Sequence, residues 1–192
     1  MLWSVANNGD GALLAGGTSD GRAGVVARIV GESITILADR LDVPPIRAIA
    51  PRGDGTFVGA CEHGTIIHLR GDTILERKRV CEANLLAVDV IDASAEIFVV
   101  GQGAWAFRCA LDPLRAEPEP VDTTSSLGCL AHDGVVAWAG SERGRILRRH
   151  QGHWRRMNDA GLGEAAVLAI AASPDGVRAL LADGQLVVGR PT

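Results

Sequence analysis

The segment of this 192-residue chain richest in reactive side chains is residues 142–157, ERGRILRRHQGHWRRM, with six arginines and two histidines. Clustered arginines can neutralise phosphates, so this segment could contact nucleic acid. The whole chain is acidic, however, with a formal net charge of −4, and Trp154 is the one aromatic here that could stack on a base. We therefore do not expect nucleic acid as a partner. We favour two other interpretations of this basic segment. It forms a charged outer strand that resists edge-to-edge pairing, or it forms a flank that binds an acidic protein.

The five histidines of the chain form no recognisable metal-binding motif. His150 and His153 are three residues apart, whereas His63, His68 and His132 lie in other segments. A structural zinc site needs about four converging ligands and a catalytic one about three. We therefore expect no metal and no cofactor.

The four cysteines show neither a CxxC pair nor zinc-ligand spacing; they are Cys61, Cys81, Cys109 and Cys129. This pattern favours free thiols that are buried as small apolar side chains. A reducing, cytoplasmic compartment is the simplest location.

Asp89 is the acidic residue that best fits hydrolytic chemistry, because it interrupts an apolar segment, LAVDV. Glycosidases use a pair of carboxylates, and the comparable apolar segments elsewhere supply no second one. No GxSxG nucleophile elbow occurs. No phosphate-binding GxxxxGK[ST] loop occurs either, and Lys78 is the sole lysine. The sequence therefore predicts a protein that is not an enzyme.

The elements that must position these residues repeat five times along the chain. Each repeat has a short apolar segment, a polar turn and a second apolar segment, and its first segment carries an apolar anchor: Val5, Ile49, Val88, Leu130 and Ile170. Successive anchors are 44, 39, 42 and 40 residues apart. A strand-forming repeat of about forty residues is typical of β-propeller blades. We therefore predict an all-β fold, a β-propeller of about five short four-stranded antiparallel blades.

The predicted blades form a single domain over residues 1–192, with the innermost strand first in each; they span about residues 2–45, 46–84, 85–125, 126–165 and 166–192. In the third blade the fourth-strand segment, LRAEPEPV, contains prolines that fit only an outermost edge strand. The fifth blade ends after its third strand and is therefore incomplete. We favour a closed five-bladed ring; a piece of a larger propeller and an association of several copies are the alternatives.

The turns between the second and third strands should lie together on one rim of such a propeller. They place seven polar residues there: Asp20, Glu62, His63, Gln102, Glu142, Arg143 and Asp183. Aspartate and glutamate beside glycine are good turn residues in any protein. Alternatively, the four carboxylates form a mildly acidic ring that attracts a cation or a basic segment of a partner.

The innermost strands should line the central channel, so Asp89 is a candidate channel carboxylate. The four tryptophans lie on different strands and are expected to pack in the core: Trp3, Trp105, Trp138 and Trp154. A carbohydrate-binding face would instead offer aromatic side chains at equivalent positions of each blade.

Residues 137–157, AWAGSERGRILRRHQGHWRRM, resemble repeats of the photosystem-assembly-factor and BNR-like propeller families. The matching positions are Trp138, Gly140, Gly144, Ile146, Gly152 and Trp154. The turn SPDG at residues 173–176 is similar to the first hairpin of WD40 and YVTN-type repeats. The first and third repeats lack the fourth-strand tryptophan, and no WD dipeptide or sialidase Asp-box occurs. The resemblance implies a propeller fold and a bias toward binding protein partners, and it does not imply sialidase catalysis.

These observations predict a non-catalytic binding or scaffold module that recognises a protein partner through one rim. The alternative is binding of a small ligand or carbohydrate, with or without glycoside hydrolysis, at the channel mouth. No signal-peptide region is present and no apolar run approaches the roughly 20 residues of a spanning helix. We therefore expect no membrane association.

Overall fold

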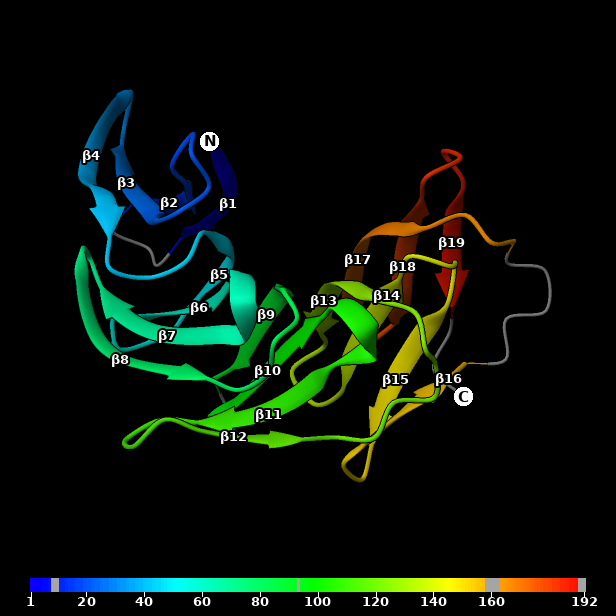
Figure 1. Ribbon diagram of the computed structural model, residues 1–192. Helices are drawn as coiled ribbons and strands as arrows, with labels where there is room; N and C mark the ends of the chain where they lie inside the picture. Colours follow the sequence, from blue (N-terminus) through cyan, green and yellow to red (C-terminus); the bar gives the residue numbers. More distant parts are fainter. Residues whose placement is uncertain (8–10, 93, 158–162, 190–192) are drawn as a thin grey trace.

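The chain forms five antiparallel β-sheets (Figure 1). The computed structural model describes residues 1–7, 11–92, 94–157 and 163–189. The first sheet contains β1 (Leu2–Asn7), β2 (Ala12–Gly17), β3 (Gly24–Val30) and β4 (Ser33–Leu41). The second contains β5 (Ile46–Pro51), β6 (Phe57–Cys61), β7 (Thr65–Arg70) and β8 (Thr73–Arg79). The third contains β9 (Leu85–Ile91), β10 (Glu96–Gly101), β11 (Ala106–Ala110) and β12 (Arg115–Pro118).

The fourth sheet contains β13 (Leu127–His132), β14 (Ala137–Ser141), β15 (Ile146–His150) and β16 (His153–Arg156). The fifth contains three strands, β17 (Val167–Ser173), β18 (Gly176–Leu181) and β19 (Leu186–Gly189). Two single-turn 3-10 helices, η1 (Glu62–Gly64) and η2 (Gln102–Ala104), connect β6 to β7 and β10 to β11. Residues 190–192, which the sequence assigns to the fifth blade, lie outside the described residues.

Within each sheet the strands follow the order of the chain. The first strands, β1, β5, β9, β13 and β17, pack against one another in succession, so they are the innermost strands. The predicted all-β, blade-based propeller fold is therefore confirmed, including the three-stranded last blade. The proline-containing β12 is also the outermost strand of its sheet, as predicted, and pairs with β11 alone.

Apolar side chains of the repeat anchors hold successive sheets together. Ile49 and Val88 are buried in the clusters that join their own sheet to the preceding one. Leu130 and Ile170 pack against the equivalent clusters further along the chain. Because side chains alternate along a strand, the residue after an anchor faces the following sheet, as Ala50 does. Each internal blade therefore has two apolar faces, which explains the continuous apolar runs in the sequence.

The five sheets form an open arc, with the first and last sheets at its two ends (Figure 1). Among the described residues, each hydrophobic cluster joins neighbouring sheets and none joins the first sheet to the last. The anchor of the first repeat, Val5, is accordingly 60% exposed, and Leu186 of the last blade is 65% exposed. The closed five-bladed ring favoured from the sequence is therefore not observed among the described residues.

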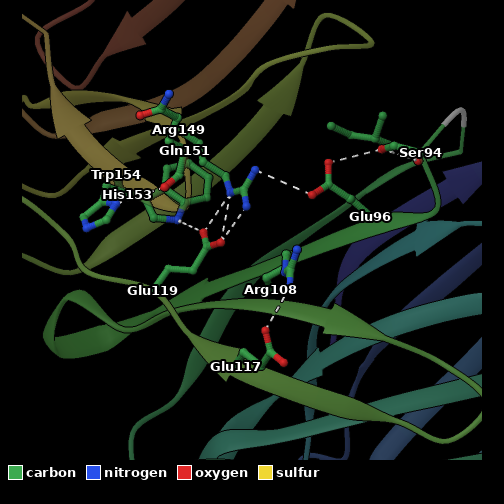
Figure 2. Close-up of polar contacts among 10 residues, drawn as sticks. Ser94, Glu96, Arg108, Glu117, Glu119, Arg149, Gln151, His153 and Trp154 are labelled. Carbon is green, nitrogen blue, oxygen red and sulfur yellow. Dashed lines mark hydrogen bonds and ion pairs between the residues drawn. The ribbon is translucent and has the colours of Figure 1, made fainter.

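The basic stretch forms β15 and β16, the two outer strands of the fourth sheet, as predicted. Figure 2 shows the guanidinium of Arg149 against the carboxylate of Glu119, which belongs to the chain segment after the third sheet. The guanidinium of Arg148 lies 5.6 Å from the centre of the Trp138 ring. Part of the positive charge of the stretch is therefore engaged within the fold, which weakens the case for a nucleic-acid site.

Candidate binding surface on one rim

The turns after the second strands lie at the same end of all five blades, and we call this end the rim (residues 18–23, 62–64, 102–105, 142–145 and 182–185). A backbone hydrogen bond repeated in every blade fixes their position. An N–H at the end of the second strand donates to the carbonyl just before the first strand, at 2.8–3.0 Å: Gly17 to Met1, Glu62 to Pro45, Gln102 to Asn84, Glu142 to Ser126 and Ala182 to Ala166. Each rim turn is thereby held beside the segment that enters its own blade.

Asp20 lies on the rim of the first blade and is held by its neighbours. The hydroxyl of Thr18 donates to its carboxylate, and Arg40 donates to it at 2.9 Å. These contacts, the Thr18 hydrogen bond first and Arg40 second, lower the pKa of Asp20 to about 2. Asp20 is therefore ionised at any physiological pH, and its charge is partly balanced by Arg40.

Glu62 does not belong to a free acidic ring, contrary to one interpretation of the sequence. Its carboxylate forms an ion pair with Arg47, and the Glu62 side chain is only 16% exposed. The guanidinium of Arg47 in turn lies 4.3 Å from the centre of the Trp3 ring, within the range of a cation–π contact. The first strand of the second blade thus supplies a cation that the turn sequences alone did not reveal.

Asn84 links the rim turns of the second and third blades. Its side-chain oxygen accepts a hydrogen bond from the backbone N–H of His63 at 3.0 Å. Its own backbone N–H donates to the side-chain oxygen of Gln102 at 3.4 Å. The turn also depends on Gly64, where a Cβ atom would lie 2.1 Å from the carbonyl oxygen of Cys81. His63 and Gln102 are therefore brought close together, with exposed side chains.

Glu142, Arg143 and Asp183 are exposed on the rims of the fourth and fifth blades. A side-chain oxygen of Asp183 accepts a hydrogen bond from the backbone N–H of Gln185 at 3.0 Å, as a turn residue does. Arg143 lines a polar depression of about 520 Å³ together with Asp122 and other residues of the segment that leads into the fourth blade. Among the described residues, neither Glu142 nor Asp183 has an ion-pair partner, so both are rim carboxylates open to a partner.

Two of the four tryptophans do not pack in the core, contrary to the expectation from the sequence. Trp138 and Trp154 are buried, as expected, but Trp3 and Trp105 are 37% and 41% exposed. Trp105 follows η2 directly and stacks on Phe107, with ring centres 5.5 Å apart and planes within 7°. Both exposed tryptophans precede or begin a strand at the rim, and this position was the signal that could have identified them.

Asp89, the candidate channel carboxylate, lies on β9 beside His132 of β13, with 3.8 Å between Oδ1 and Nε2. Nδ1 of His132 accepts a hydrogen bond from the backbone N–H of Gly134 at 3.0 Å, so the neutral ring carries its proton on Nε2. Burial raises the pKa of Asp89, and the charge of His132 opposes this. Among the described innermost strands no other carboxylate occurs. The site therefore offers a carboxyl–imidazole pair and lacks the second carboxylate of a glycosidase.

Comparison with known proteins agrees with the fold. No family model and no curated protein matches the chain. Its structure is similar to that of U3-55K, a WD40 β-propeller protein, with a TM-score of 0.76 and 11% sequence identity. The similarity covers 97% of this chain but 62% of that chain, so this chain spans less than two thirds of it. At this identity the likeness shows the fold alone, which is propeller-like.

Proposed function

We propose that the chain is a non-catalytic module that recognises a protein partner through the rim. The observation that carries the proposal is the exposure of two tryptophans, Trp3 and Trp105, on the rims of the first and third blades, with the half-exposed Arg47 of the second blade against Trp3. Tryptophan and arginine are the residue types that most often dominate binding energy at protein interfaces. A propeller-like fold supports this function, because it presents turns from every blade on a common surface.

The charges on the rim indicate what kind of surface the partner presents. Arg47 neutralises Glu62, and Arg40 balances Asp20. Glu142 and Asp183 supply negative charge further along the arc. A partner with apolar groups facing the tryptophans and basic groups facing these two carboxylates fits this arrangement better than a uniformly basic segment.

We also propose that the chain forms a single domain and that it is located in the cytoplasm. We treat residues 1–192 as one domain, because hydrophobic clusters join each sheet to the next. The resemblance to BNR-like repeats stays a prediction. The four cysteines are free thiols in the structure, which supports a reducing, cytoplasmic location. In the part of the chain that the structure describes, no helix is long and apolar enough to span a bilayer.

Site-specific photo-crosslinking in a lysate of the source organism tests the proposal. A photoreactive residue at Gln102 on the rim is compared with one at Glu117 on β12, since both positions are exposed and lie on the same blade. We expect a discrete crosslinked protein from position 102, its loss with Trp105→Ala, and no such product from position 117. Equal products from both positions, or none from position 102, would count against the rim.

The second candidate function is binding of a small ligand at the channel mouth, and the Asp89–His132 pair is the observation that favours it. Its test is a solution NMR screen of sugars and small carboxylate or amine ligands. Shifts in the His132 ring signals that disappear with Asp89→Asn would support this site.

A further inference from the structure

His68, Glu76 and Asp112 converge between the second and third blades. His68 on β7 and Glu76 on β8 are directly paired across the strands, and Asp112 lies in the hairpin between β11 and β12. One ring nitrogen of His68 and one oxygen from each carboxylate lie within 4.8 Å of one another. One imidazole and two carboxylates form a donor set that suits first-row divalent cations.

The hydrogen bonds of His68 decide which of its ring nitrogens is available. The hydroxyl of Thr56 donates to a carboxylate oxygen of Asp54 at 2.6 Å, because a carboxylate can only accept. The Thr56 oxygen is therefore free to accept from Nε2–H of His68, which lies 2.9 Å away. This chain places the proton of the neutral ring on Nε2 and leaves a lone pair on Nδ1. Metal-binding histidines are typically oriented in this way, by a hydrogen bond from the other nitrogen.

Two polar atoms of the cluster are buried and have no hydrogen-bond partner among the residues that the structure describes. His68 is only 5% exposed, and its Nδ1 is one of these atoms. The Oε2 atom of Glu76 is the other. Buried polar groups nearly always have a hydrogen-bond partner. The lone pairs of these two atoms are therefore available to a group that accepts electron pairs, such as a metal ion.

The charge around the cluster favours the same kind of group. Among the described residues neither Glu76 nor Asp112 has an arginine or lysine as an ion-pair partner. Arg52, whose charge acts on His68, is engaged by Asp54 at 3.1 Å. Two carboxylates and a neutral imidazole therefore leave about two uncompensated negative charges, and a divalent cation would balance them.

We propose that His68 Nδ1, Glu76 and Asp112 bind one divalent transition-metal ion, of which Zn²⁺ is the representative. Ligand atoms of a tetrahedral zinc site with bonds of about 2.0–2.1 Å lie about 3.3 Å apart. The cluster must therefore contract by about 1.5 Å. Glu76 is half-buried and Asp112 is exposed, so these two side chains can move toward the fixed imidazole. The bound ion would join the outer strands of the second and third blades and leave a coordination position open.

The test is a titration of the chelator-treated, untagged chain with Co²⁺ and Zn²⁺, followed by visible absorption and isothermal calorimetry. We expect one ion per chain and a rise in melting temperature on binding. Glu76→Gln and Asp112→Asn should each weaken binding at least tenfold. Thr56→Val, which keeps the shape but removes the acceptor for Nε2–H, should weaken it by about 10–100-fold.

Two control variants separate this site from incidental binding. Asp72→Asn removes an exposed carboxylate from the turn of the β7–β8 hairpin, which also carries His68 and Glu76, and should leave affinity unchanged. The double substitution His150→Gln and His153→Gln removes the histidine pair of the β15–β16 hairpin and should also leave it unchanged. The proposal is overturned if no ion binds, or if binding survives Glu76→Gln and Asp112→Asn but is lost with the histidine pair. It does not depend on the rim function.

Discussion

Arg149 and Glu119 form a two-point contact between the fourth blade and the segment that leaves the third. Nε and one terminal nitrogen of Arg149 donate to the two Glu119 oxygens at 2.8 Å and 2.6 Å. The Glu119 side chain is 7% exposed and also accepts from Nε1 of Trp154 at 2.9 Å (Figure 2). The hydrogen bonds that Arg149 donates to Glu119 raise the pKa of Arg149. A residue from the most basic stretch of the chain therefore serves blade packing.

Removing the Glu119 carboxylate should destabilise the fold. Glu119→Ala removes the hydrogen-bond acceptor of the indole N–H of Trp154 and leaves Arg149 with only its ion pair to Glu96 at 3.6 Å. Removing one partner of such a largely buried pair costs about 3 kcal/mol. Glu119→Gln keeps the side-chain volume and one acceptor oxygen, so it should lower the free energy of unfolding by less than Glu119→Ala does. Urea unfolding of both variants measures the difference. A Glu119→Ala variant as stable as the wild type would show that this contact adds nothing to the fold.

Because the first blade lies at an open end of the arc, its anchor Val5 should contribute less to stability than the equivalent buried anchor Val88. Val88→Ala removes two methyl groups from a buried cluster and should lower the free energy of unfolding by about 2 kcal/mol. Val5→Ala makes the same change at an exposed position and should cost less than about 0.5 kcal/mol. Because strand propensity changes equally in both variants, the difference between their urea midpoints reports burial. Equal losses would indicate that the face of the first blade is covered in solution.

Charge reversal should affect Glu62 and Glu142 differently, although both lie on the rim. Glu62→Lys places a second cation against Arg47 in a half-buried site and should destabilise the chain by about 1–2 kcal/mol. Glu142→Lys changes an exposed carboxylate and should leave the melting temperature nearly unchanged. Thermal denaturation followed by circular dichroism compares them. Binding experiments on the rim should therefore use Glu142 and Asp183, since a defect in Glu62→Lys would combine lost binding with lost stability.

Asp20 should titrate far below an ordinary aspartate. A carboxyl carbon NMR titration should give a pKa of about 2. Since the folded pKa lies below the unfolded value, the contribution of Asp20 to stability is present above about pH 4 and is lost as pH falls through about 2. Thr18→Val should raise the pKa toward 3.8, and Arg40→Gln should raise it less. A wild-type pKa near 3.8 would contradict the hydrogen bonding described for this turn.

The blades could be predicted from the sequence because their period is set by local patterning. Apolar runs, turn residues and the prolines at positions 118 and 120 each constrain one strand. The ring closure could not be predicted, because it depends on the angle between packed sheets, which no short segment encodes. The pairing of Glu62 with Arg47 was missed for a similar reason: Glu62 lies in η1 and Arg47 on β5, and no spacing rule connects them.

The candidate sites show the same limit. The position of the rim residues followed from strand order, whereas the exposure of Trp105 did not, because an exposed and a buried tryptophan can follow the same apolar pattern. His68, Glu76 and Asp112 come from two blades, and a scan for adjacent ligands in the sequence does not find them. The repeat pattern predicts the strands within each blade, but it does not predict which side chains of different blades come into contact.

The open arc also affects how the molecule loses structure. Each blade is supported by its neighbours alone, so the free energy of folding is close to a sum of blade and interface contributions. The first and fifth blades each have one such interface, while the second, third and fourth have two. Opening should therefore begin at both ends and proceed inward, with backbone amides of β9 and β10 exchanging with solvent most slowly. An arc of this kind frays, whereas a closed ring would have to break an interface before any blade could leave.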